Sequence, residues 1–189
     1  AKVDVPVVGG STQAAATPSD PAVGTPSRAE GAVPELPRER FEVTTDVLKL
    51  TFDTQGGSLV RTEFLKHADM ADKSRNVVLL DDTHEHAYVA QTGLWLPGAQ
   101  GTGAPTHKTV MKVLPGARSL SQGGNELLIR FESPEVGGIK LVKTYTVTRG
   151  SYVLAVRHEV VNVGTAARAP QWDLRLVRDG SKPPGEPSW

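Results

Sequence analysis

The sequence predicts an all-β protein built from antiparallel sheets. Short stretches of alternating apolar and polar residues recur along the chain with Gly- and Pro-rich turns between them, and no apolar period near 3.6 residues persists for three turns. The clearest stretch is 139–161, where two arms rich in Val, Ile, Tyr and Thr flank the turn Arg149-Gly150-Ser151. Because a hairpin of this length is unstable alone, we expect further strands to cover it.

The two faces of the second hairpin arm differ in polarity. One face contains Tyr152, Leu154, Val156, His158 and Val160, so it is apolar apart from one histidine, and the opposite face is mixed. This pattern is typical of a sheet that places one face on a core and leaves the other partly in solvent.

The first 40 residues have a different composition from the rest. They contain six prolines and no aromatic residue. Such a segment buries too little apolar surface to offset its loss of conformational entropy, so we expect residues 1–40 to be a disordered linker. We favour a tether between an upstream anchor and the folded part over a tail without a role. Ordered structure is predicted to begin at Phe41 and to form one domain over 41–189.

The remaining strands follow from alternation and turn residues. Leu48, Leu50 and Phe52 share one face, and Gln55-Gly56-Gly57 supplies the turn into a return strand. Residues 94–108 are rich in Gly and Pro and are predicted to form an exposed loop with Trp95 as an anchor at its start. The predicted strands are 48–53, 58–65, 77–80, 86–92, 109–113, 126–131, 139–148, 152–161 and 171–177, with a short segment around Leu120.

Charge and composition exclude several function classes. Lys+Arg and Asp+Glu number 21 each, and the sequence pI is about 7.2, which disfavours nucleic-acid binding. The absence of cysteine excludes disulfides, thiol catalysis and cysteine–zinc sites but leaves the compartment open. No apolar run approaches the ~20 residues that span a bilayer. The chain starts at Ala1, and we interpret it as an excised or processed piece whose targeting segment lies outside it.

His84-Glu85-His86, after Asp81-Asp82, is the best candidate metal site. Residues two apart on a strand project from the same face, so the two histidines could share a cation with a carboxylate. We favour a solvated loop that leads into a strand, because no second ligand cluster lies nearby in the sequence.

Two candidate acid–base sites can be named. His158 could act as a general base, although a core or edge histidine is the interpretation we favour, and its neighbour Glu159 points to the other face. Glu132 and Glu135 form a pair of carboxylates, but they flank Pro134 in a predicted turn, where solvation of the charges is the simpler explanation.

Two further stretches resemble binding motifs only weakly. Gly101 and Gly103 form a Gly-x-Gly without the third glycine or a strand–helix context, which argues against phosphate binding. Arg178, Asp179 and Lys182 occupy a C-terminal turn for which a structural role is favoured. We therefore predict no catalytic, cofactor-binding or metal-ligating residues, no cofactor, and a protein that is not an enzyme.

Several stretches together resemble one known family. They are VTTDVLKLTFDTQGGSLVRTEFLKH, YVAQTGL, KTYTVTRGSYVLAVRHEVVNVG and LRLVRDGSKPPGEPSW. In this order and spacing they resemble the large periplasmic domain of the YidC-type membrane protein insertases of Gram-negative bacteria, over residues 41–189. The Ala/Pro-rich tract before Phe41 is similar to the flexible linker that this family places after an N-terminal membrane helix.

The resemblance implies an antiparallel β-supersandwich related to galactose-mutarotase-like proteins, located on the periplasmic side of the cell inner membrane. It implies a non-catalytic accessory role in the insertion and folding of inner-membrane proteins, alone or with the Sec translocon. SecDF, SecYEG and nascent inner-membrane proteins are the partners that it implies. A carbohydrate-binding or mutarotase-like domain is the alternative, and it would need a histidine and a carboxylate that converge in a cleft, although fold alone does not imply function.

The resemblance also implies that the sequence covers only the first half to two-thirds of the family's periplasmic domain and lacks its membrane domain. A supersandwich truncated in this way leaves sheet edges unpaired and an inner face partly uncovered. We expect residues 41–189 alone to be poorly soluble, self-associating or only partly ordered. Part of the cover of the hairpin is expected to lie beyond Trp189.

Overall fold

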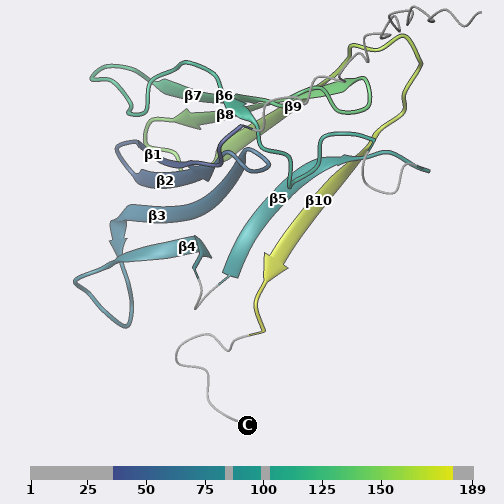
Figure 1. Cartoon of the computed structure of the whole chain (residues 1–189). Helices are drawn as coiled ribbons and strands as arrows, with labels where there is room; N and C mark the ends of the chain where they lie inside the picture. Colours follow the sequence, from purple (N-terminus) through teal and green to yellow (C-terminus); the bar gives the residue numbers. More distant parts are fainter. Residues whose placement is uncertain (1–35, 84–86, 99–102, 181–189) are drawn as a thin grey trace, which may run out of the picture. The chain divides into compact units, whose positions relative to one another are not determined.

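The computed structural model describes residues 36–83, 87–98 and 103–180, and within these ranges every regular element is a β-strand (Figure 1). Among them no helix is long and apolar enough to cross a bilayer. The predicted all-β antiparallel class is confirmed. The strands are β1 (Arg40–Thr44), β2 (Leu48–Asp53), β3 (Ser58–Ala68), β4 (Asn76–Asp82), β5 (Ala87–Trp95), β6 (Lys112–Val113), β7 (Glu126–Glu132), β8 (Ile139–Thr148), β9 (Leu154–Asn162) and β10 (Gln171–Arg178).

The larger sheet has six strands in the order β1-β2-β3-β4-β5-β10. β3 also pairs directly with β5, through Leu59 opposite Ala90. β10 returns from the far end of the chain and lies antiparallel to β5 along its whole length, starting with Gln171 opposite Trp95 (Figure 1). The last described strand therefore forms one edge of the sheet that contains the first described strands.

The smaller sheet has four strands in the order β6-β7-β8-β9 and contains the predicted hairpin. Gly150 lies in the turn with a φ of 70°, a left-handed conformation that favours glycine. β9 begins at Leu154, two residues later than the predicted Tyr152, because the Val153 amide donates to the Ser151 hydroxyl and extends the turn. The hairpin prediction is otherwise confirmed.

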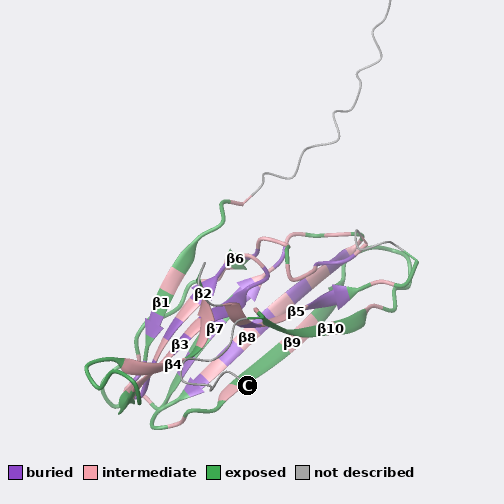
Figure 2. Ribbon diagram, turned by 90° about the horizontal axis from the view of Figure 1, so that it is seen from below, coloured by how far each residue is buried: buried purple, intermediate pink, exposed green. Residues whose placement is uncertain are grey.

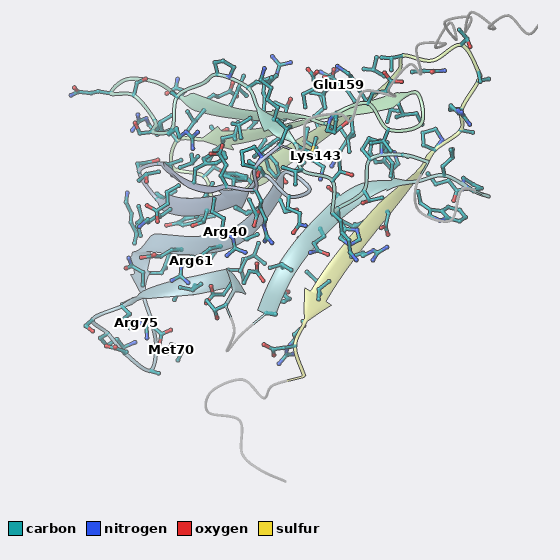
Figure 3. The ribbon with its side chains drawn as sticks, in the orientation of Figure 1. Arg40, Arg61, Met70, Arg75, Lys143 and Glu159 are labelled. Atoms are coloured by element: carbon teal, nitrogen blue, oxygen red, sulfur yellow. The ribbon has the colours of Figure 1, made fainter. Side chains whose placement is uncertain are left out.

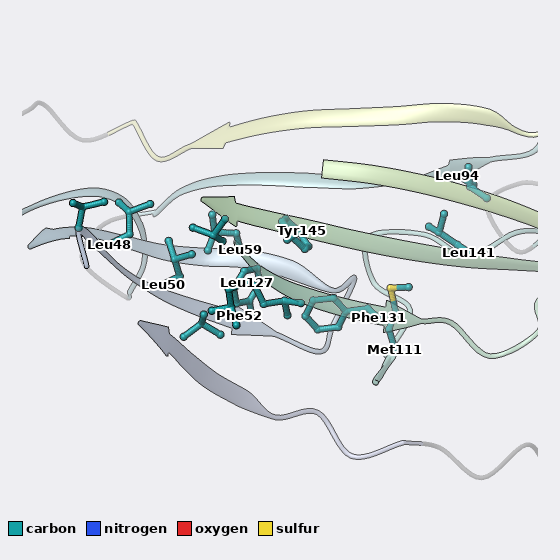
Figure 4. Close-up of a cluster of buried hydrophobic side chains, with 14 of the residues drawn as sticks. Leu48, Leu50, Phe52, Leu59, Leu94, Met111, Leu127, Phe131, Leu141 and Tyr145 are labelled. Atoms are coloured by element: carbon teal, nitrogen blue, oxygen red, sulfur yellow. The ribbon is translucent and has the colours of Figure 1, made fainter. Parts of the chain in front are cut away.

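The two sheets enclose a cluster of apolar side chains (Figure 4). Its centre is aromatic: the ring of Phe52 lies 4.9 Å from that of Tyr145 and 5.8 Å from that of Phe131, centroid to centroid. Phe52 comes from the larger sheet, and the other two rings come from the smaller one. The predicted inward face of Leu48, Leu50 and Phe52 is fully buried, so alternation identified this part of the core correctly.

The outer strands β9 and β10 are largely exposed, in contrast to the alternating burial of β2 and β8 (Figure 2). Val156 and Val160 lie opposite buried residues of β8 and share their face, yet they are 42% and 39% exposed. In β9 the expectation that this hairpin face rests on a core is correct for Leu154, which packs against the apolar cluster, and wrong for Val156 and Val160. β9 is an edge strand of the smaller sheet, and on this face the larger sheet contacts it at His158, through Thr92 of β5 and Trp172 of β10.

The loop that follows β5 is also packed differently from the prediction. Ala104 and Met111 are buried, and the Leu94 amide donates to the Pro105 carbonyl. A Cβ at Gly93 would meet the His107 backbone nitrogen at 2.6 Å, so the absence of a side chain lets this segment lie flat on β5. The predicted exposed loop is therefore wrong for its described second half. Trp95, the predicted anchor, is exposed.

Candidate functional site

A buried polar tie joins the two sheets. On β8, Lys143 and Tyr145 occupy core positions between apolar neighbours, and both reach across to the turn between β2 and β3. The Lys143 Nζ donates to the Gly56 carbonyl oxygen at 2.6 Å, and the Tyr145 hydroxyl donates to the Gly57 carbonyl oxygen at 2.7 Å. The Gly-Gly turn thus presents two successive carbonyls to two successive inward-facing side chains of the other sheet.

Lys143 also contacts β5, because its Nζ donates to the Thr92 carbonyl oxygen at 2.6 Å. The side chain is fully buried and lies between the two layers (Figure 3). No carboxylate of the described residues pairs with this ammonium, and burial disfavours its charge and lowers the pKa of Lys143 from 10.5 to about 7. Burial likewise raises the pKa of the Tyr145 hydroxyl, which stays protonated and remains a donor.

His158 extends this polar group toward the exposed strands β9 and β10, which we call the open end of the sandwich. Its Nε2 shares a hydrogen bond of 2.8 Å with the Thr92 hydroxyl, and its ring lies 5.0 Å from that of Trp172 on β10. Burial, together with the positive charge of Lys143, lowers the pKa of His158 to about 4. The imidazole is therefore neutral near pH 7 and joins β9 to β5 and β10.

A different histidine, His107, lies close to a carboxylate. His107 Nδ1 is 3.9 Å from Asp173 Oδ2, and the Asp173 carboxylate is already paired with Arg175 at 2.8 Å. His107 Nδ1 is buried and has no hydrogen-bond partner among the described residues. Burial and the charge of Arg175 lower the pKa of His107, so this ring is also mainly neutral near pH 7.

The sequence-predicted metal candidate is only partly described. His84, Glu85 and His86 lie outside the described residues. The two aspartates before them form ion pairs, Asp81 with Arg61 at 2.9 Å and Asp82 with Arg40. Among the described residues, no group of three or more His, Cys, Asp or Glu side chains is placed to hold a metal ion.

The carboxylates considered for acid–base chemistry have the following surroundings. Glu159 lies on β9 (Figure 3). As the next residue of the strand after His158 it points to the opposite face, and it pairs with Arg157 at 3.1 Å. Glu132 pairs with Lys140 at 2.9 Å, while Glu135 is exposed.

The last two weak motifs lie at the limits of the described ranges. Gly101 falls outside them, and the Gly103 carbonyl lies against Gly137, where a Cβ would meet it at 2.3 Å. The Asp179 carboxylate accepts a hydrogen bond of 2.6 Å from the Ala87 amide, so this residue of the C-terminal turn fastens the end of β10 to the start of β5. Arg178 is the last residue of β10, and Lys182 lies outside the described ranges.

Lys143 and Trp172 were missed by sequence reasoning. A signal for Lys143 was present, because it interrupts the apolar series of Ile139, Leu141, Tyr145 and Val147 on one face of a strand. A charged residue in such a series indicates a buried contact that the sequence does not identify.

Comparisons with known proteins decide the family. The model of the YidC periplasmic domain matches residues 40–189. The chain belongs to this family. Both halves of the polar tie fall in stretches that carry the resemblance, the Gly-Gly turn in the first and the Lys-Thr-Tyr of β8 in the third.

Proteins named membrane protein insertase YidC are similar along most of the chain. The protein from Bordetella avium (strain 197N) is 44% identical over 84% of this chain and 28% of its own length. Those from Herminiimonas arsenicoxydans and Dechloromonas aromatica (strain RCB) are each 39% identical, over 89% and 96% of this chain. The chain spans 24–30% of the length of such relatives. The family places the domain on the periplasmic side of the inner membrane.

Proposed function

We propose that this chain acts as a non-catalytic interaction module of a membrane protein insertase. It would support the insertion and folding of inner-membrane proteins, alone or beside the Sec translocon, and its partners would be nascent inner-membrane proteins and the SecDF and SecYEG subunits. The observation that carries the proposal is the match of the YidC periplasmic domain to residues 40–189. In the same proposal the predicted linker 1–40 acts as a tether up to the residues just before β1, which begins at Arg40, and the folded part extends from there onward.

The chemistry of the polar groups supports a structural and binding role. Lys143 donates to two backbone carbonyls, and His158 bonds Thr92, so each group already has a partner in the fold. A general base needs a proton to abstract within hydrogen-bond reach and a pKa near the working pH. The pKa of His158, at about 4, is too low for an efficient base near pH 7.

The test is deletion of the region that corresponds to residues 40–178 from a full-length insertase in living cells. We expect most insertion of a reporter membrane protein to persist while co-purification of SecDF and SecYEG weakens. A matched control replaces the region with an unrelated folded periplasmic domain, which separates loss of spacing from loss of contacts. Complete loss of insertion in the deletion, with the protein still present in the membrane, would contradict an accessory role.

A carbohydrate-binding domain is the second candidate, and one observation favours it. The exposed indole of Trp172 lies beside the neutral imidazole of His158 on an open sheet face, which is a stacking surface with a polar group at its edge. Calorimetric titration with galactose and glucose tests this candidate, with Trp172→Ala as the matched variant. Heat of binding that disappears in the variant would support it, and no heat at millimolar sugar would eliminate it.

A further inference from the structure

The segment just before β1 is held on the sheet by charged contacts. Arg38 donates from Nε to both carboxylate oxygens of Asp53 at 3.0 Å and from Nη2 to Oδ2 at 2.6 Å. Arg40 donates from Nε to the same Oδ2 at 2.9 Å. The Gln55 amide donates to Oδ1 at 2.8 Å. Two guanidinium groups from one short segment therefore converge on a single carboxylate at the end of β2.

Main-chain contacts fix the residue between the two arginines. The Glu39 amide donates to the Thr54 hydroxyl, and the Thr54 amide donates to the Glu39 carbonyl oxygen, both at 2.9 Å. Arg40 also reaches Asp82 of β4, so its side chain spans the sheet from β1 toward β4 (Figure 3). Residues 38–40 are thus held by both side-chain and backbone bonds.

The burial of Asp53 explains why these contacts are needed. Its side chain is 1% exposed, and an unpaired carboxylate in such a position would lose its hydration without compensation. Burial by itself raises the pKa of Asp53, but the hydrogen bonds from Arg38, Gln55 and Arg40 outweigh it and bring the pKa below 3.8. The arginines stay about half exposed, so they stabilise the carboxylate while most of their own hydration is retained.

We propose that Asp53 is the anchoring site of the segment 38–40, and that Arg38 and Arg40 form a strap that holds β1 on the larger sheet. Phe41 follows the strap directly, and its ring packs 5.8 Å from Phe52 and 5.9 Å from Phe131. β1 is an edge strand of the larger sheet and pairs with β2 alone within that sheet, so its detachment would need fewer hydrogen bonds to break than that of an inner strand. The strap adds charged hydrogen bonds to the pairing of this edge strand, directly before its first core residue.

The strap is tested by limited trypsin digestion of the whole chain, because trypsin cleaves after arginine. In the unmodified chain we expect the bonds after Arg38 and Arg40 to be cleaved slowly. In Asp53→Asn the geometry stays similar but the charge is lost, and cleavage at these two bonds should rise at least about tenfold. Mass spectrometry identifies the bonds, and circular dichroism reports whether the sheets remain folded.

Controls keep the result interpretable. Glu135→Gln removes an exposed carboxylate and should leave cleavage after Arg38 and Arg40 unchanged. If Asp53→Asn does not fold, Arg38→Gln is a milder substitution, because Arg40 still bonds the Asp53 carboxylate. Cleavage after Arg40 should still rise in this variant. Its matched control is Arg130→Gln, at an exposed arginine. Unchanged cleavage in a folded Asp53→Asn or Arg38→Gln chain would overturn the proposal. An equal rise at all arginines would also overturn it, because that result reports global loosening.

Discussion

Apolar and polar residues alternate along the strands at both ends of the sandwich, but the apolar residues are buried at one end and exposed at the other. Where β2 faces β7 and β8, every second residue is buried, and the aromatic rings of both sheets meet. At the outer strands the alternation continues, but Trp172, Leu174 and Leu176 are 56%, 76% and 66% exposed. They lie opposite Leu94, Thr92 and Ala90 of β5 and share the face that bonds His158. Alternation therefore reports which way a side chain points, and the presence of an opposing layer decides whether it is buried.

The largest difference between the two ends should appear on truncation of a core side chain. Phe52 is fully buried, and Phe52→Ala is expected to reduce the free energy of unfolding by about 3–5 kcal/mol, from lost transfer energy and the cavity that remains. Leu174→Ala at the open end is the matched control and should change it by less than about 0.5 kcal/mol. Urea denaturation followed by circular dichroism measures both, and equal losses would contradict the comparison.

The buried amine of Lys143 should make stability depend on pH. Between pH 7 and pH 9 the unfolded chain keeps a proton on this lysine, whereas the folded chain, with a pKa of about 7, releases it. Because the unfolded state binds more protons, stability rises with pH, by about 2–3 kcal/mol over this range.

Lys143→Met should remove this rise, whatever its effect on the absolute stability. The measurement is urea denaturation at several pH values from 7 to 9. Lys140→Met, on the opposite face of the same strand, should keep the rise. A slope that survives in Lys143→Met would assign the pH dependence to another group.

The hydroxyl of Tyr145 should contribute a smaller amount. Tyr145→Phe leaves the Gly57 carbonyl without its donor in the core, and we expect a loss of about 1–2 kcal/mol. Tyr152→Phe removes a hydroxyl that bonds His67 at 3.0 Å in an exposed position, where water replaces the partner, so its loss should be under about 0.5 kcal/mol. Chemical denaturation distinguishes the two, and a reversed order would mean that the tie between the sheets is not a significant stabilising contact.

Substitutions of exposed leucines at the open end should have the smallest effect on the free energy of unfolding and a clear effect on self-association of the chain. Exposed apolar sheet faces promote self-association, as the resemblance led us to expect for residues 41–189. The double substitution Leu174→Lys/Leu176→Lys should leave the free energy of unfolding within about 0.5 kcal/mol and reduce association in sedimentation velocity runs. Leu79→Lys/Leu128→Lys adds the same charge at other exposed sites and should not. A dilute, monomeric wild-type chain with a sharp two-state melt would contradict this expectation.

Some of the candidate sites could be judged from the sequence, and some could not. The opposite orientation of His158 and Glu159 follows from the two-residue period of a strand, and the structure has them on opposite faces. The approach of His107 to Asp173 joins residues far apart in the sequence, through a loop that lies on Gly93. No local pattern predicts that approach.

The sequence by itself determined the all-β class, the hairpin of β8 and β9, and the inward face of β2, because these depend on local alternation and turn residues. Its motifs also identified the family. Only the tertiary structure decided which inward faces are covered, and it alone paired Lys143 and Tyr145 with the Gly-Gly turn and Arg38 with Asp53. The physical reason is distance along the chain: Tyr145 and Gly57 are 88 residues apart, and their hydrogen bond exists only because two sheets face each other.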